Sequence, residues 1–510
     1  MSRTEGPGLH WVGRWLLDRA RANPEGTAIE CAGRRLNYSQ LLERVIVMAA
    51  DLRRRGARPG DRVATITHND VDQICLLFAC CWTGATLVPL NWRLAPPELA
   101  AQLDVVMPAL VASGDSHWQQ AADALTASAC APEHVSLASL GRPPALAGVT
   151  PAVVADDDPL LIIFTSGTTG RPKGAVLTHA NCFWTNLSFD GAVPLSSHDV
   201  VLQVLPQFHV GGWNVQPLQA FWKGARLLLE RDFDPGRALS VISKQRVTTM
   251  MGVPTTYLRM AEDPGFSRAD LSSLHQVVVG GAAMPPDVLE AWLRRGVAVV
   301  QGYGLTEASP NVLCLPTADA TTRAGSVGRP YGFVDVELHD PFTEERLDGP
   351  ATGELWVSGP NVFAGYWHDE RSTQATMNGR WLRTGDVAER DEAGYYRISA
   401  RLKEIYISGG ENVYPGEVEA VLRAHPCVAD AAVVGVADRR WGEVGVAFVE
   451  ARPGRALTDE DLVGHCRSRL AGFKLPRRVL VVDALPRLGS GKLDKRALAS
   501  MAAPWGEVPS

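Results

Sequence analysis

Residues 164–174 read FTSGTTGRPKG and place four hydroxyl side chains, three glycines and two cations directly after the apolar run LLIIF. Glycines let the backbone approach an anion closely, and hydroxyl and backbone N–H groups donate hydrogen bonds to phosphate oxygens. A lysine adds a point charge. This combination indicates a polyphosphate site with Lys173 near the β- and γ-phosphates. The candidate binding residues are Thr165, Ser166, Gly167, Thr168, Thr169, Gly170 and Lys173.

Other phosphate loops do not fit this segment. A Walker A loop requires GxxxxGK followed by Ser or Thr, but Pro172 stands five residues after Gly167, and Lys173 is followed by Gly174. The segment also lacks the GxGxxG pattern of a kinase glycine loop. A flexible Ser/Gly linker would explain the glycines, but neither the two cations nor the apolar runs on both sides.

The composition narrows the class of protein. A chain of 510 residues, 46% hydrophobic and 21% charged, is expected to form a soluble protein of two or more domains. A net charge of −6 without a dense Lys/Arg block argues against a nucleic-acid partner. Nine cysteines without a CxxC pair argue against a disulfide framework or zinc site and favour the reducing cytoplasm.

No membrane span or signal peptide is expected. The start MSRTEGPGLHW lacks the apolar stretch of a signal peptide. The most hydrophobic segment, residues 74–90, is short for a membrane span and contains Gly84. We expect it to form a buried helix followed by a buried strand.

Short apolar runs alternate with helical segments over the first part of the chain. RVATIT is followed by a helix that Asn69 or Asp70 can cap, and then by ATLVPL. VVVGG leads through two prolines to DVLEAWLRR, Gly296 and VAVVQGYG. Proline near a helix start and glycine just past its end are typical punctuation. The pattern predicts an α/β fold, with a large N-terminal domain (1–400) of parallel-rich sheets covered by helices.

The pattern changes after Arg401. EVEAVLRAH and DEDLVGHCRSRL are predicted helices, the second capped by Thr458, and AAVVGVAD, GEVGVAFVEA and RRVLVVDALP are predicted strands. These elements predict a small, separate α+β C-terminal domain (401–510).

TSGTTGRPKG resembles the signature of the adenylate-forming superfamily, which includes acyl-CoA synthetases, peptide-synthetase adenylation domains and beetle luciferases. VVVGGAAM, QGYGLTEAS, GELWVSGPNVFAGYW, WLRTGDVA, ARLKEIYISGGENVYPGEVE and RLGSGKLDK follow in the family's order, so the resemblance covers nearly the whole chain. It implies a large N-terminal domain, a small mobile C-terminal domain and an active site between them. It also implies two steps: a carboxylate attacks the α-phosphate of ATP, and a thiol then attacks the acyl-adenylate.

The resemblance also implies the nucleotide contacts. Glu307 would bind Mg²⁺, a hard cation that carboxylates suit, and Tyr303 would pack on adenine. Asp386 and Arg401 would bind the ribose hydroxyls, and Lys492 would bridge the carboxylate and the α-phosphate. The other residues implied along the nucleotide are Gly281, Ala282, Ala283, Gly302, Gly304, Leu305 and Thr306. The implied catalytic set is Lys492, Lys173, Thr165, Glu307 and His209.

The small domain would rotate about a hinge at Lys403 between the two steps. Lys492 would serve adenylation, and the Gly409–Gly410 loop would then lie near the thiol tunnel, with Trp441, Phe473 and Lys474 as CoA contacts. Ala400 and Glu404 depart from the glycine and aspartate usual beside the hinge, and these departures concern its geometry rather than the chemistry.

His209 matches an aromatic position that gates the acyl pocket in related synthetases, and a buried structural histidine is the competing interpretation. The residues expected to line the acyl pocket are His209, Gly211, Gly212, Trp213, Asn214, Val279, Gly280 and Ser309. They are mostly apolar or small, and no acidic residue stands where it could bind an α-amine. This favours a hydrophobic carboxylic acid, whether fatty, aryl or polycyclic, over an amino acid.

CoA is the expected acceptor because no carrier domain is fused to the chain, with a separate carrier protein as the alternative. ATP, Mg²⁺ and CoA are therefore the expected cofactors and co-substrates. Fatty acid metabolism is one expected pathway, and a homodimer is compatible with the sequence. The alternative class of protein is a non-catalytic paralogue that binds ligands or regulates without catalysis. The joint presence of Lys173, Glu307, Asp386, Arg401 and Lys492 argues against it.

Overall fold

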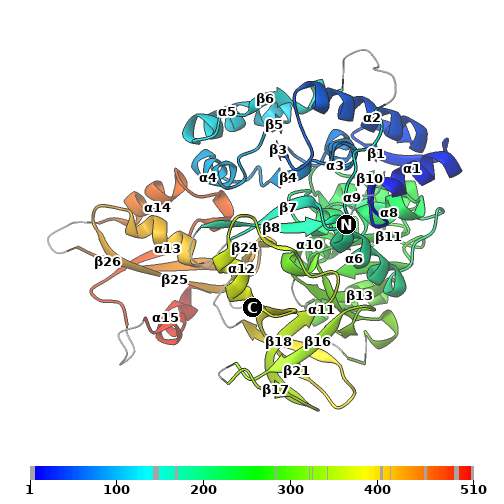
Figure 1. The fold of residues 1–510 in the computed structure, drawn as a ribbon. Helices are drawn as coiled ribbons and strands as arrows, with labels where there is room; N and C mark the ends of the chain where they lie inside the picture. Colours follow the sequence, from blue (N-terminus) through cyan, green and yellow to red (C-terminus); the bar gives the residue numbers. More distant parts are fainter. Residues whose placement is uncertain are drawn as a thin grey trace.

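The structure is a computed structural model, and it describes residues 6–141, 149–166, 171–281, 284–320, 322–323, 325–341, 343–401, 406–413, 415–452, 457–486 and 493–506. Figure 1 shows a large body with a smaller lobe beside it, drawn in orange to red. The large body is the N-terminal lobe (residues 6–401), and the smaller part is the C-terminal lobe (residues 406–506).

One sheet of the N-terminal lobe has the strand order β15–β14–β13–β12–β11–β9–β10–β1–β2. Its inner strands run parallel, and antiparallel strands β2, β14 and β15 complete its edges. The strands are β1 (Thr27–Cys31), β2 (Arg34–Asn37), β9 (Val200–Gln203), β10 (Arg226–Leu229), β11 (Thr249–Gly252), β12 (Gln276–Val279), β13 (Ala298–Gly304), β14 (Asn311–Leu315) and β15 (Arg329–Pro330).

A second sheet has the order β19–β8–β7–β4–β3–β5–β6, with parallel strands from β7 to β6 and an antiparallel edge at β8 and β19. The strands are β3 (Arg62–Ile66), β4 (Thr86–Leu90), β5 (Leu110–Ser113), β6 (Glu133–Ser136), β7 (Pro159–Ser166), β8 (Pro172–Thr178) and β19 (Gly365–Tyr366). Both sheets confirm the predicted parallel α/β class.

Helices surround these sheets. They are α1 (Gly13–Ala22), α2 (Tyr38–Arg54), α3 (Val71–Thr83), α4 (Pro96–Val106), α5 (Trp118–Ala127), α6 (His179–Ala192), α7 (Gly211–Asn214), α8 (Pro217–Lys223), α9 (Pro235–Gln245), α10 (Pro254–Glu262), α11 (Pro286–Arg294) and α12 (Glu370–Thr376). In the described parts of the chain, no helix is both long enough and apolar enough to cross a membrane.

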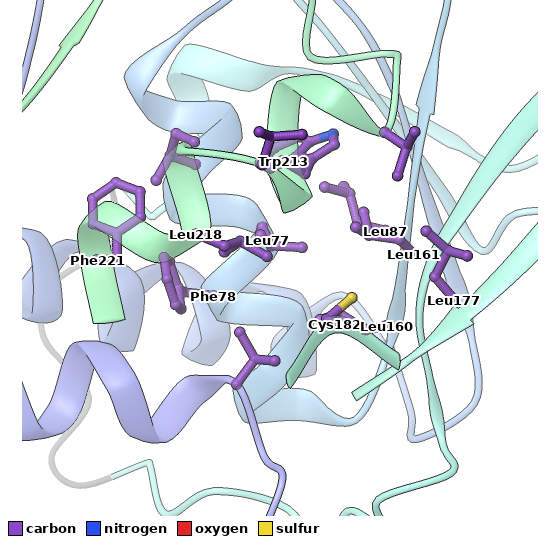
Figure 2. Close-up of a cluster of buried hydrophobic side chains, with 14 of the residues drawn as sticks. Leu77, Phe78, Leu87, Leu160, Leu161, Leu177, Cys182, Trp213, Leu218 and Phe221 are labelled. Atoms are coloured by element: carbon purple, nitrogen blue, oxygen red, sulfur yellow. The ribbon is translucent and has the colours of Figure 1, made fainter. Parts of the chain in front are cut away.

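Helix α3 is the most hydrophobic segment and lies at the centre of the core. The Asp70 side chain accepts a hydrogen bond from the Asp72 N–H at its start, and Gly84 ends it in the left-handed conformation with φ +76°. All of its residues are buried, and β4 follows directly. The predicted buried helix and strand are therefore confirmed. Figure 2 shows Leu77 of α3 in the same buried cluster as Leu161 and Trp213.

A third sheet completes the N-terminal lobe and lies at the bottom of the view in Figure 1. Its order is β17–β16–β18–β21–β20, and β22 pairs with β21. The strands are β16 (Asp335–His339), β17 (Arg346–Leu347), β18 (Ala351–Ser358), β20 (Met377–Asn378), β21 (Trp381–Arg390) and β22 (Tyr396–Arg401).

The C-terminal lobe has its own sheet of order β24–β23–β26–β25, with β27 beside β26. Two buried clusters lie on its two faces and consist mainly of residues of this lobe. The elements are β23 (Tyr406–Ser408), β24 (Glu411–Val413), α13 (Pro415–Arg423), β25 (Val428–Asp438), β26 (Gly442–Ala451), α14 (Asp459–Arg467), β27 (Arg478–Val482) and α15 (Lys495–Ala502). Thr458 caps α14, as predicted.

Candidate active site

The phosphate segment connects β7 to β8, which form an antiparallel hairpin. Thr165 and Lys173 are paired across it, and Thr165 Oγ1 lies 3.5 Å from the Lys173 carbonyl oxygen. The two ends of the predicted phosphate site are thus side by side. Gly167, Thr168, Thr169 and Gly170 lie outside the described residues, as does the side chain of Ser166, so their phosphate contacts stay predictions.

Tyr366 connects the candidate phosphate cation to the candidate magnesium ligand. Strand β19 pairs with β8 and places the Tyr366 ring beside Lys173, with 5.1 Å from Nζ to the ring centroid. The Tyr366 hydroxyl donates to Glu307 Oε1 at 2.7 Å. Glu307 lies in a 3₁₀ turn, Thr306–Ala308, after the end of β13. One tyrosine therefore holds a cation on its face and a carboxylate at its hydroxyl.

A second group contains the residues expected at the adenosine. The Tyr303 hydroxyl donates to Asp386 Oδ2 at 2.6 Å, so the end of β13 is joined to the middle of β21. Asp386 is buried and pairs in register with Arg401 on β22. The side chain of Arg401 lies outside the described residues. The two positions predicted to bind ribose hydroxyls are therefore direct neighbours across two strands.

Gly281 begins the loop that was predicted to run along the base. Its φ of +82° lies in the left-handed region, which favours glycine. A Cβ at Gly281 would lie 3.5 Å from Val253 Cγ1, and one at Gly410 of the C-terminal lobe would lie 3.4 Å from Val253 Cγ2. The Gly409–Gly410 turn thus contacts the N-terminal lobe close to this loop. Ala282 and Ala283 lie outside the described residues.

His209 meets the C-terminal lobe at Glu411. His209 Nε2 lies 2.8 Å from Glu411 Oε2, and Arg93 Nη1 lies 2.6 Å from Glu411 Oε1. The Arg93 guanidinium also faces the rings of Trp92 and Phe208, at 5.2 and 5.5 Å from their centroids. Glu411, 4% exposed, is therefore held by two side chains of the other lobe.

Two opposing effects act on the Glu411 carboxyl. Burial alone would raise its pKa, but the adjacent His209, through charge and a hydrogen bond, and Arg93 outweigh burial and lower the pKa below its ordinary value. The carboxylate form is therefore the one that this lobe arrangement favours.

A cavity of about 420 Å³ lies between the lobes and collects several of the predicted residues. Its walls include Thr165, Phe208, His209, Thr306, Glu411, Phe473 and Lys474. Residues predicted for the phosphate, the acyl gate and CoA therefore surround one space. Trp441 lies outside this wall, where its ring packs against Gly409.

The residues predicted for the acyl pocket divide into two groups. Gly211 and Gly280 face Met251, because a Cβ at either position would lie 4.0 and 2.9 Å from Met251 Cε. Gly212 packs against the Pro206 carbonyl, and Trp213, Asn214, Val279 and Ser309 are buried. Trp213 belongs to the core cluster, so its role in the pocket stays a prediction.

Lys492 and Lys403 lie outside the described residues, so the predicted catalytic lysine and hinge stay predictions. Sequence reasoning assigned no role to Arg93, Met251, Tyr366 or Glu411. Tyr366 and Glu411 lie within quoted motifs, FAGYW and GGENVYPG, which was the available signal. Arg93 and Met251 carried none, because their partners are distant in sequence.

These features define a two-lobed α/β protein whose large lobe holds the segments predicted to bind a nucleotide and whose small lobe forms part of the cavity wall. Residues 16–367 match the AMP-binding enzyme family, and residues 417–492 match the AMP-binding enzyme C-terminal domain. The chain belongs to this family and is an adenylate-forming acyl-CoA synthetase, an acid–thiol ligase.

Two curated relatives align over nearly the whole chain. Feruloyl-CoA synthase from Amycolatopsis sp is 42% identical over 492 residues, which cover 95% of this chain and 97% of the relative. Indoleacetate–CoA ligase from Aromatoleum aromaticum is 37% identical over 501 residues, which cover 96% and 98%.

Two solved structures of o-succinylbenzoate CoA synthetase from Bacillus subtilis are also similar, each at 28% identity. A double mutant bound with its product analogue OSB-NCoA aligns with a TM-score of 0.87, covering 95% of this chain and 98% of that one. The complex with the acyl-adenylate intermediate OSB-AMP aligns with a TM-score of 0.71, covering 95% and 97%.

Proposed function

We propose that this synthetase joins an aromatic carboxylic acid to CoA, with ATP converted to AMP and pyrophosphate. The observation that supports an aromatic acid is the glycine at position 302, whose carbonyl oxygen lies close to Gly280 of the predicted acyl pocket. A Cβ at Gly302 would meet no atom closer than 3.5 Å, and its φ is not positive, so neither packing nor conformation requires glycine there. We infer that a residue without a side chain here, next to Gly280 of the predicted acyl pocket, favours a flat ring.

The curated relatives support the same class. Their names specify feruloyl and indoleacetate groups, and both are aromatic acids. A flat ring has few internal rotations to lose on binding, so a narrow apolar space binds it at a low entropic cost. Fatty acids are the alternative substrates that the experiment below separates.

In the first step, a carboxylate oxygen of the acid attacks the α-phosphorus, and the bond to the β-phosphate oxygen breaks as pyrophosphate leaves. Lys173 is proposed to bind the β- and γ-phosphates and Lys492 to orient the carboxylate. Glu307 fits Mg²⁺, because this ion is usually held by one or two carboxylates together with substrate phosphates. When bound, Mg²⁺ would neutralise charge on the phosphates.

In the second step, the CoA sulfur attacks the acyl carbon, the bond to AMP breaks, and the thiol proton passes to solvent. The interlobe cavity beside His209 and Glu411 is the proposed path of the thiol. We place the reaction in the cytoplasm, where the nine free cysteines fit a reducing environment.

Mass-spectrometric product detection tests this function. The protein is incubated with Mg-ATP and a panel of cinnamic, indolic, fatty and polycyclic acids, each with and without CoA. Aryl-adenylate without CoA and aryl-CoA with it would support the proposal. Fatty acyl-CoA alone would replace the aromatic class, and adenylate that persists with CoA would indicate a carrier protein or another acceptor. Lys492→Ala should abolish adenylate formation.

A further inference from the structure

Lys474 lies at the boundary between the lobes and is 7% exposed. Its Nζ lies 3.0 Å from Glu98 Oε1 and 2.6 Å from Glu417 Oε2. Glu98 belongs to α4 of the N-terminal lobe and Glu417 to α13 of the C-terminal lobe. One ammonium group therefore binds a carboxylate from each lobe.

The segment that carries Lys474 is also packed against the other lobe through apolar contacts. Ala471, 3% exposed, belongs to a cluster formed by Leu99 and Leu103 of α4 with strands of the second sheet. Phe473 packs against this cluster and against the main cluster of its own lobe. The segment 471–474 of the C-terminal lobe, here called the wedge, therefore packs directly against α4.

Glu98 is a fixed anchor for this wedge. Its second oxygen, Oε2, accepts a hydrogen bond from the Ala95 N–H at 3.0 Å, at the start of α4. The helix end therefore orients the carboxylate, and Oε1 is left to bind Lys474. Less side-chain entropy is lost when the lobes meet, because Glu98 is already ordered.

The pKa values of Lys474 and Glu417 depend on each other and on Glu98. Burial lowers the pKa of Lys474, but Glu417 and Glu98 outweigh burial and raise it above its ordinary value. Burial raises the pKa of Glu417, Lys474 opposes this shift, and Glu98 adds to it. Glu98 and Glu417 therefore repel each other, and the ammonium between them offsets that repulsion. Without the ammonium group, this lobe arrangement would place two carboxylates beside each other with no cation between them. Separation of the lobes would relieve that repulsion.

The same cavity wall contains Lys474, Glu98 and Glu417 together with His209 and Glu411. The structure is also closer to the synthetase bound with a CoA product analogue, at a TM-score of 0.87, than to the same synthetase with an acyl-adenylate, at 0.71. Both comparisons cover 95% of this chain, so the difference reflects arrangement rather than length.

We propose that Lys474 is a positioning residue for thioester formation, because it joins Glu98 to Glu417 and so holds the lobe arrangement that encloses the interlobe cavity. The inference rests on the proposed function. In this arrangement the Lys474 ammonium group, which was expected to contact CoA, is bound to both carboxylates.

Separate assays of the two steps test the proposal. Adenylation is followed as pyrophosphate release without CoA, and transfer as a single turnover from preformed adenylate with saturating CoA. Lys474→Met keeps the side-chain length and removes the charge. We expect transfer to fall by about tenfold or more and adenylation to change by less than about twofold, since loss of one partner of a buried pair is strongly destabilising. Arg467→Met, an exposed change in the same lobe, is the control.

A second variant isolates the repulsion. Glu98→Gln keeps an oxygen for the Ala95 N–H and removes a charge, so adding it to Lys474→Met should restore part of the transfer rate. A purely structural loss would not be restored. Equal loss of both steps, no loss of transfer, or a raised KM for CoA with an unchanged saturated rate would overturn the proposal.

The lobe arrangement can be measured without turnover. Spin labels on the exposed positions Gln119 and Arg467 report the interlobe distance in each variant. Lys474→Met should broaden the distribution, and Glu98→Gln should narrow it again. An unchanged distribution would refute the proposal even if the wild type forms no acyl-CoA, in which case the proposed function would fail separately.

Discussion

His209 Nε2 lies 2.8 Å from Glu411 Oε2, although the two residues are 202 positions apart and belong to different lobes. The position predicted to gate the acyl pocket is thus attached to the small lobe. Movement of the lobe would free the imidazole, and its return would fix the ring again.

Glu411→Gln should slow thioester formation by about 10- to 100-fold, because a hydrogen bond to a charged group contributes about 1.5–3 kcal/mol. Adenylation should be nearly unchanged. Single-turnover assays of the two steps measure this split, with the exposed Glu460→Gln as control. A parallel loss in both steps would show that Glu411 does not act through this lobe arrangement.

Substitution by alanine should be tolerated at Gly302 but not at Gly304. A Cβ at Gly302 makes only ordinary contacts, whereas one at Gly304 would lie 1.4 Å from the Pro310 carbonyl oxygen. Gly302→Ala should keep the melting temperature within about 2 °C, and Gly304→Ala should lower it by several degrees.

A larger residue at Gly302 tests the acyl pocket itself. Gly302→Val should raise the KM for aromatic acids by about tenfold while the KM for ATP changes little, because the branched side chain occupies the space of the ring. Steady-state kinetics with each substrate varied in turn would reveal this. A selective rise in the KM for ATP would instead assign Gly302 to the nucleotide.

Tyr366→Phe removes the hydrogen bond to Glu307 and keeps the ring beside Lys173. We expect adenylation to fall by about 5- to 20-fold, with a higher Mg²⁺ requirement, since the carboxylate loses the group that orients it. Transfer from preformed adenylate should be unaffected. Titration of pyrophosphate release against Mg²⁺ measures the effect, and an unchanged titration would contradict it.

His179 should make stability depend on acid pH. It is fully buried, accepts a hydrogen bond from the Val12 N–H at 3.2 Å, and burial lowers its pKa from 6.5 to about 3. Above pH 6.5 the ring is neutral in both folded and unfolded states. Below it the unfolded state binds a proton that the folded state excludes, so stability falls until the pH reaches about 3, by up to about 1.4 kcal/mol per unit.

His179→Asn keeps an acceptor and removes the titration. Urea unfolding between pH 7.5 and 5 should therefore give the variant a shallower loss of stability than the wild type. Identical slopes would show that His179 does not control this dependence. His117, whose pKa burial also lowers, to about 4, is present in both proteins and cancels in the comparison.

Much of the fold could be predicted from local patterns in the sequence. Strand β26 matches the predicted GEVGVAFVEA, and α3 begins at the predicted cap and ends before Gly84, because caps and apolar periodicity act between near neighbours. Thr165 lies beside Lys173, and Tyr303 contacts Asp386, because these residues belong to motifs whose order follows the family.

The contacts between lobes were beyond prediction from sequence alone. Lys474 and Glu98 are separated by 376 positions, and Lys474 was expected to contact CoA rather than a carboxylate of the other lobe. Their meeting depends on how two separate cores are placed against each other, which local periodicity does not encode. Tyr366 was likewise missed, because its role arises from the pairing of a two-residue strand with β8.

Val253 has a property that the ion pairs at the lobe boundary lack. Its two methyl groups face Gly281 in one lobe and Gly410 in the other, so the volume of one side chain sets the spacing between the two loops. Such a contact carries no charge. Salt screens charge–charge contacts, although less when they are buried, and leaves apolar ones intact, so this point of contact persists when the ionic strength changes.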